Sequence, residues 1–284
     1  MKFAFLLFAF VFSICAAAQT TLFERVGLPG TSVYTDLKSA FREPKSVHRL
    51  QLTGLVEEKQ QKRIATLTNL EALKLEQNGW SNLPAPFYTL SSLLYLRSEG
   101  NPFTGLSDSV ALPAGLRFAE FSGTAFDTLP SALCKLPGLS LLTISKNTDT
   151  LKFSKAAGTM PFLTEFNLMS LAVDSTLWNI TTLPRLEKLT LYNCSLTRID
   201  PRIAQLSSLR EINLSGNKLQ TFPRELTQLT QLKRLVLRDN QLTKIDSRIC
   251  FLTNLEFLDL RGNPMTQYEI ECVKVLLPRC DILF

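Results

Sequence analysis

Apolar residues recur along this chain at one fixed period, and within each period they alternate with polar residues. In the segment LREINLSGN, the side chains of Leu209, Ile212 and Leu214 fall on one face of an extended stretch. The same nine-residue form begins at Val47, Leu70, Leu93, Leu116, Leu139, Leu163, Leu186, Leu209, Leu232 and Leu255. Successive starts are 23 residues apart, except for one interval of 24. A constant period of this length predicts a repeat array in which each repeat supplies one short strand.

The residues after each strand predict a turn and a return toward the next strand. The ninth residue is Asn in six repeats, and its amide is expected to satisfy backbone groups of the turn. Leu55 and Leu171 take this position in two other repeats, which predicts breaks in the ladder of Asn side chains. Apolar residues then recur at steps of three or four, as at Ile199, Ile203 and Leu206. That spacing favours a short helix or 3₁₀ turn.

These repeats resemble the leucine-rich repeat family, in the 23-residue form where LPxxIxxLxxL follows the strand segment. The segment LPSALCKLPGL, from Leu129 to Leu139, shows this form, and the resemblance covers the chain from about Val47 onward. The resemblance implies an α/β fold, a leucine-rich repeat solenoid of about ten repeats. In this fold the chain forms a curved right-handed superhelix, with a parallel β-sheet on the concave face and short helices, 3₁₀ turns and loops on the convex face. The architecture does not by itself define a function.

The chain divides into four parts on this interpretation: a signal peptide (1–18), an N-terminal cap (19–46), the repeats (47–264) and a C-terminal cap helix with a tail (265–284). In the N-terminal cap, Thr35 is expected to cap a short helix from Asp36 to about Arg42. A longer helix is expected from Gln267 to Leu277, where apolar residues at helical spacing lie across the last repeat.

The first eighteen residues have the pattern of a secretory signal. Lys2 precedes an apolar run, and small residues stand before a predicted cleavage between Ala18 and Gln19. A lipoprotein signal that uses Cys15 is the alternative. The sequence therefore predicts export to the periplasm, the cell surface or the extracellular space. No other apolar stretch approaches the ~20 residues that a membrane-spanning helix needs.

Charge and candidate chemistry argue for a binding protein without catalytic activity. Without Lys2, 30 basic residues stand against 25 acidic ones, and both signs alternate through every repeat, so nucleic acid is not an expected partner. His48 is the only histidine, and no nucleophile motif accompanies it, which predicts neither an enzyme nor a cofactor or metal site. Cys194 is expected to be a buried thiol, and Cys272 and Cys280 are left open as a possible disulfide.

The outward positions of the strands are the candidates for partner binding. Tyr95, Phe118 and Leu141 occupy the third position of consecutive repeats and predict an apolar strip, rimmed by Arg97 and Glu120 at the fifth position. We expect a monomer that binds a protein or peptide through this strip. Glycan or cell-wall binding by the same face is the alternative, and it would use Tyr95 and Tyr192.

Two further features are expected to bear on function. Tyr192, Arg238 and Arg261 share the seventh position and form a second, weaker candidate surface, because Asp239 and Asp259 are placed to neutralise the arginines. The repeat with the extra residue puts Asp149 at a core position, which predicts either a bulged convex loop or a partner-binding distortion. Trp178, in the next repeat, is expected to be exposed on the convex side.

Overall fold

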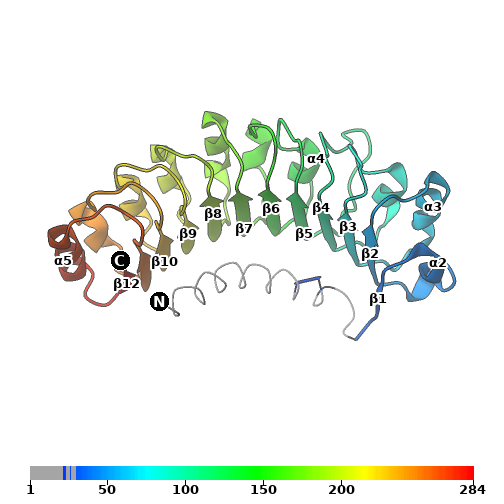
Figure 1. The fold of residues 1–284 in the computed structure, drawn as a ribbon, viewed down its shortest axis with the longest axis horizontal. Helices are drawn as coiled ribbons and strands as arrows, with labels where there is room; N and C mark the ends of the chain where they lie inside the picture. Colours follow the sequence, from blue (N-terminus) through cyan, green and yellow to red (C-terminus); the bar gives the residue numbers. More distant parts are fainter. Residues whose placement is uncertain (1–21, 24–25, 27–29) are drawn as a thin grey trace.

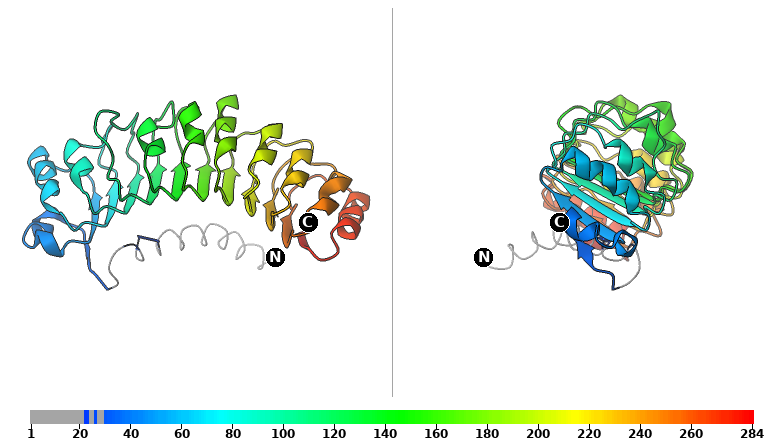
Figure 2. Two further views of the ribbon diagram at one scale, coloured as in Figure 1. Left: turned by 180° about the vertical axis from the view of Figure 1, so that it is seen from behind. Right: turned by 90° about the vertical axis from the view of Figure 1, so that its right-hand side faces the viewer.

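The computed structural model describes residues 22–23, 26 and 30–284 of the chain. Twelve strands form one parallel sheet in sequence order, from β1 to β12. The strands line the inner side of an arch, and the short helices and 3₁₀ turns lie on its outer side (Figures 1 and 2). The predicted solenoid is therefore confirmed. The signal peptide predicted for 1–18 lies outside the described residues, and among those described no helix is long and apolar enough to span a membrane.

Ten strands come from the ten repeats, and one further strand lies at each end of the sheet. The strands are β1 (Val33–Tyr34), β2 (Arg49–Thr53), β3 (Ala72–Glu76), β4 (Tyr95–Glu99), β5 (Phe118–Ser122), β6 (Leu141–Ser145), β7 (Glu165–Met169), β8 (Lys188–Tyr192), β9 (Glu211–Asn213), β10 (Arg234–Val236), β11 (Phe257–Asp259) and β12 (Asp281–Leu283). β1 and β12 were not expected from the repeat pattern. Each adds a parallel neighbour to an end repeat, so the terminal repeats gain backbone hydrogen bonds.

The helical segments outside the sheet are mostly 3₁₀ turns, and they include the helices of the two caps. They are α2 (Leu37–Ala40), η1 (Pro44–Ser46), α3 (Glu58–Arg63), η2 (Ile64–Thr66), η3 (Ala85–Thr89), α4 (Ser131–Cys134), η4 (Lys155–Gly158), η5 (Ser175–Thr182), η6 (Pro201–Gln205), η7 (Arg224–Gln228), η8 (Ser247–Phe251) and α5 (Gln267–Leu276). The predicted C-terminal helix is present as α5. The N-terminal helix is shorter than expected, and Asp36 caps it in place of Thr35, because the Asp36 carboxylate accepts a hydrogen bond from the Ser39 N–H at 2.8 Å.

Each strand buries the residues that the alternation predicts. Leu209, Ile212 and Leu214 are all at most 1% exposed. The strand pairing places Ile212 beside Leu189 on one side and beside Leu235 on the other, so equivalent positions stack through the core. Burial of these columns stabilises neighbouring repeats together rather than one repeat alone.

In the repeats that carry it, the Asn side chain ties the turn to the preceding repeat, as Asn217 shows. The Asn217 amide accepts hydrogen bonds from the backbone N–H groups of Cys194 and Leu196, at 3.1 and 3.0 Å. It donates to the carbonyls of Leu191 and Leu214, at 2.6 and 2.8 Å. Four backbone groups that would otherwise be buried without partners are thus satisfied by one side chain.

The residue before this ninth position has a left-handed backbone in all ten repeats. Glycine takes it in five of them and a side-chain residue in the other five: Gly54, Gln77, Gly100, Gly123, Lys146, Ser170, Asn193, Gly216, Asp239 and Gly262. Glycine adopts a positive φ without steric cost, whereas other residues are strained there. The tight turn off the strand therefore requires this conformation whichever residue occupies it.

The irregular repeat keeps its core by moving the apolar positions along the loop. Asp149 is exposed, and Leu151 and Phe153 fill the core instead. Leu151 also forms a parallel bridge with Val173 of the next repeat. Trp178 is 5% exposed, so the prediction that it is exposed is wrong. The eight-residue turn η5, longer than its neighbours, carries this side chain into the core.

Candidate binding face

The structure brings the predicted strip together on the concave face. Tyr95 of β4 pairs with Phe118 of β5, and Phe118 pairs with Leu141 of β6. In the same strands, Arg97 pairs with Glu120. These five residues therefore form one surface, and we call Tyr95, Phe118 and Leu141 the apolar strip from here on.

One end of the apolar strip is covered by the chain itself. Phe23 and Val26 pack on Tyr95 and Ala72, and all four side chains are buried. The Phe23 and Tyr95 ring centroids are 5.8 Å apart, at an interplanar angle of 56°. Tyr95 is 0% exposed, so the prediction that its side chain lies open to a partner is wrong. Phe118 and Leu141 remain half-buried, as a surface strip requires.

Two basic side chains, Arg49 and Lys74, also contact the residues that cover Tyr95, which we call the covering segment. The buried Arg49 guanidinium donates from Nε to the Val26 carbonyl at 3.1 Å and from Nη1 to the Thr31 carbonyl at 3.2 Å. The Lys74 ammonium lies 5.3 Å from the centre of the Phe23 ring. The repeat pattern alone gives no sign of this role of Arg49, because it does not reveal what lies over the sheet.

Arg97 and Glu120 form a charged group beside the strip, in which Glu120 is buried and Arg97 is half-buried. Arg97 Nη2 lies 2.8 Å from Glu99 Oε2, and its Nη1 lies 3.7 Å from Glu120 Oε2. Burial raises the pKa of Glu120, although the positive charge of Arg97 acts in the opposite direction. The hydroxyl of Tyr95 is buried close to both charges but outside normal hydrogen-bond geometry, and burial raises its pKa as well.

The second candidate surface is largely neutralised by neighbouring carboxylates. Arg261 Nη2 lies 2.6 Å from Asp259 Oδ2, and Arg238 Nε lies 3.0 Å from Asp239 Oδ2. Tyr192 is half-buried at the end of β8. The three predicted residues lie at the carboxyl ends of β8, β10 and β11, and Ser215 takes the same position after β9. Both arginine charges already have acidic partners. This surface therefore offers less unsatisfied charge than its sequence alone suggests.

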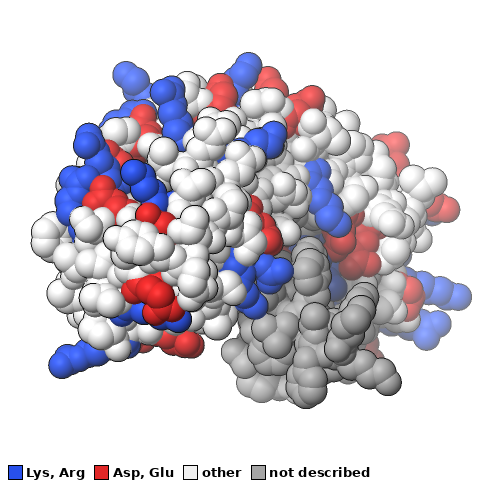
Figure 3. Space-filling view, turned by 60° about the vertical axis from the view of Figure 1, so that its left-hand side comes forward, with Lys and Arg blue, Asp and Glu red and all other residues white. Residues whose placement is uncertain are grey.

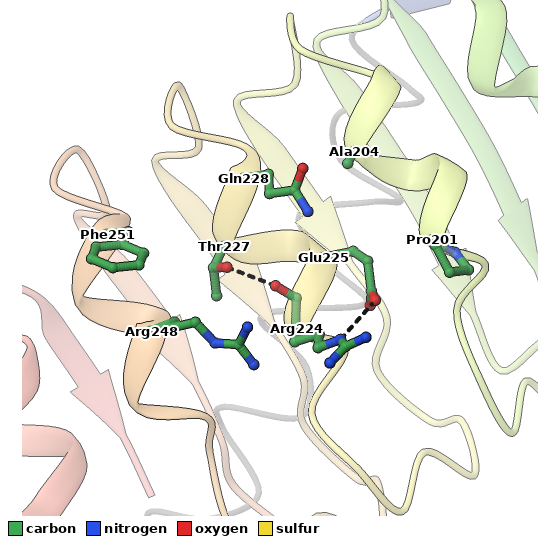
Figure 4. A pocket seen from close by; sticks show the side chains of 8 residues that line it. All are labelled: Pro201, Ala204, Arg224, Glu225, Thr227, Gln228, Arg248 and Phe251. Carbon is green, nitrogen blue, oxygen red and sulfur yellow. Dashed lines mark hydrogen bonds and ion pairs between the residues drawn. The ribbon is translucent and has the colours of Figure 1, made fainter.

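The described residues also form a depression on the convex side. A shallow depression of about 550 Å³ lies over η6, η7 and η8, between Pro201 and Phe251 (Figure 4). The charge of Arg224, which lines it, is paired with Glu225 at 3.2 Å. Among the described residues, no group of three or more His, Cys, Asp or Glu side chains is placed to hold a metal ion. His48 is half-buried, and its Nδ1 lies 3.4 Å from Glu71.

The cysteines of the described chain are all free thiols, including Cys272 and Cys280. Cys194 is buried, as predicted, and burial raises its pKa to about 12. Burial likewise raises the pKa of Cys134 to about 11. Cys250, by contrast, is exposed on η8. A buried thiol with a raised pKa is unreactive, so neither Cys134 nor Cys194 has the character of a nucleophile.

Charges of both signs are interspersed on the surface. On the side of the molecule shown in Figure 3, basic and acidic side chains alternate without a continuous stripe of one sign. Several of them pair between consecutive repeats, as Lys233 does with Glu256 at 2.8 Å.

Comparisons with known proteins agree with the repeat pattern. Residues 184–242 match the model named Leucine rich repeat, and 230–270 match Leucine Rich repeats (2 copies). The leucine-rich repeat domain of the type III effector XopL is 24% identical over 87% of this chain and 88% of that domain, with a TM-score of 0.65. An internalin from Listeria monocytogenes is 20% identical over 86% of this chain and 82% of its own, with a TM-score of 0.55.

A third similar structure is the plant peptide hormone receptor RGFR1, solved in complex with RGF2. It is 21% identical over 76% of this chain, with a TM-score of 0.57, and the match spans 39% of the receptor chain. No sequence among curated proteins matches this chain. The repeat models and the fold shared with these structures show that the chain is a leucine-rich repeat protein.

Proposed function

We propose that this chain is an exported, non-enzymatic binding protein that captures a protein or peptide partner on its concave sheet face. The observation that carries the proposal is the apolar strip, whose covered end already packs against Phe23 and Val26. The sheet thus accepts apolar side chains from outside the repeats. Phe118 and Leu141 extend the same surface and remain half-buried.

The surroundings of the strip support a protein partner over a glycan. An apolar centre with charged neighbours such as Arg97 is the composition of a protein interface. Glycan stacking on Tyr95 would need an open ring, whereas the Tyr95 ring is covered by Phe23, which leaves only Tyr192 of the two tyrosines that the glycan alternative would use. The similar plant receptor was solved in complex with RGF2, which supports a ligand-binding role by analogy of fold.

The test is affinity capture from the envelope and medium of the native organism. The double variant Phe118→Ala, Leu141→Ala should lose most of the partner that the unaltered protein retains. Phe251→Ala is the matched control, because it removes a large exposed apolar side chain from the convex side. Equal capture by all three proteins would show that the partner does not bind at Phe118 and Leu141 on the concave face. Selective binding of the unaltered protein to a glycan array would show that the partner is a glycan and not a protein or peptide.

A further inference from the structure

We infer that the surface over Arg49, Ala72 and Tyr95 is a docking site for a peptide with an aromatic residue followed three positions later by an aliphatic one. The chain's own Phe23 and Val26 are its first occupant. The inference rests on the proposed function, since it specifies the ligand chemistry of the same concave face. It adds that an incoming partner must displace a segment of this chain.

The apolar part of the site is a recess between larger side chains. Arg49, Ala72 and Tyr95 are consecutive in the outward row of β2, β3 and β4, and Ala72 is the small residue between two large ones. Phe23 and Val26 pack with Ala72 and Tyr95 in one buried cluster. A ring fits such a recess because the tilted pair of Phe23 and Tyr95 gains a ring–ring contact as well as area burial.

The two anchoring side chains stand three residues apart in the sequence. The Val26 N–H donates to the Leu22 carbonyl at 2.8 Å. Phe23 and Val26 both pack on the sheet, against Ala72 and Tyr95. The spacing of aromatic and aliphatic residues is therefore the feature that a partner must reproduce.

The polar part of the site recognises the peptide backbone and the ring. Arg49 donates to the main-chain carbonyls of Val26 and Thr31, groups that every peptide carries. Lys74 lies 5.3 Å from the Phe23 ring centre, which favours an aromatic over an aliphatic side chain at that position. The contacts to backbone carbonyls thus position any peptide, whereas the contacts to the aromatic ring and the aliphatic side chain determine which peptide sequences bind.

An incoming peptide can extend onto surface that Phe23 and Val26 leave partly open. Phe118 packs against the same cluster but is only half-buried, and Leu141 on the strand after it is half-buried as well. A tethered segment acts at an effective concentration on the order of millimolar. A site with an intrinsic Kd of ~0.1 mM is then filled by its own segment about nine tenths of the time, and vacating it raises the apparent affinity for a free peptide about tenfold.

The test uses a fluorescently labelled synthetic peptide with the sequence LFERVGLPGT, residues 22–31 of this chain. Its binding is measured by anisotropy to the mature protein, to the double variant Phe23→Ala, Val26→Ala, and to the control Phe251→Ala. The double variant should bind about tenfold more tightly than the other two, and Lys74→Ala in that background should weaken binding again. A peptide with Ala in place of its Phe should bind none of them.

Equal affinity of the double variant and the unaltered protein would overturn the inference. Partner capture that still depends on Phe118 and Leu141 would show that the proposed function stands without it. Partner capture that does not depend on those two residues would instead contradict the proposed function itself. Nitration of Tyr95 by tetranitromethane distinguishes an intramolecular occupant from a second copy. If the Tyr95 ring is protected from nitration only at high protein concentration, the occupant is the segment of a second copy, and the intramolecular assignment is wrong.

Discussion

The ring of Phe23 lies 5.8 Å from the ring of Tyr95, so a residue ahead of the repeats covers a side chain that the repeat directs outward. This contact changes how the concave face works. Tyr95 serves as an anchor for the N-terminal segment, and Phe118 and Leu141 are the part of the apolar strip left for a partner. Access to the Tyr95 end of the strip depends on whether that segment stays in place.

Removal of the Phe23 ring should make Tyr95 chemically accessible. Nitration by tetranitromethane requires an accessible phenol, and Tyr95 is 0% exposed with a raised pKa, whereas Tyr268 is 75% exposed. In the unaltered protein, mass spectrometry should find nitration at Tyr268 but little at Tyr95. In Phe23→Ala, modification at Tyr95 should rise several-fold with Tyr268 unchanged. Persistent protection of Tyr95 in the variant would show that another group buries it.

Asn217 should be among the most stability-sensitive residues of the repeats. Asn217→Ala leaves buried backbone groups of Cys194, Leu196, Leu191 and Leu214 without partners. We expect a loss of about 3 kcal/mol in the free energy of unfolding. The measurement is denaturant unfolding followed by circular dichroism. The exposed Asn82→Ala is the control and should change stability by less than about 0.5 kcal/mol.

The left-handed turn position predicts substitutions of opposite sign. Lys146 has φ = 51°, so Lys146→Gly relieves backbone strain and should raise stability by up to ~1 kcal/mol after the entropy cost of glycine. Gly123→Ala introduces the same strain, and its Cβ would lie 3.2 Å from the Cα of Gly100, so it should lower stability by about 1–2 kcal/mol. Thermal melting of both variants checks the prediction. Changes of the same sign in both would contradict it.

Glu120 should make stability depend on pH in a direction unusual for a carboxylate. Because burial raises its folded-state pKa above the usual 4.5, the fold favours the protonated form. Its contribution to stability is therefore present at low pH and lost as the pH rises from 4.5 through the folded-state pKa. Glu120→Gln, which stays neutral, should gain stability relative to the unaltered protein across that range. A stability difference that does not change with pH would mean that the carboxylate is not penalised by burial.

The repeat pattern predicted most of the fold because one alternation decides the direction of every strand side chain. Leu209, Ile212 and Leu214 are buried as predicted, and Asn217 makes the expected hydrogen bonds. The terminal strands β1 and β12 were not predicted, since two or three residues show no periodicity. Trp178 was misplaced because the longer turn η5 departs from the spacing of the other repeats.

The candidate site was predicted only in part, for a different physical reason. The period specifies that Tyr95, Phe118 and Leu141 share one face, and the strand pairing confirms it. Whether that face is open depends on contacts between residues far apart in sequence, such as Phe23 with Tyr95 and Arg49 with Val26. No local pattern encodes those contacts, so the cover over the strip became visible only in the structure.

The most direct test of concave-face binding is site-specific photocrosslinking in the cell. A photoreactive phenylalanine analogue replaces Phe118 on the concave face in one protein and Phe251 on the convex face in another. The account predicts a discrete crosslinked adduct with a second protein or peptide from position 118 and none from position 251. Adducts from position 251 alone, or the same adducts from both positions, would contradict it.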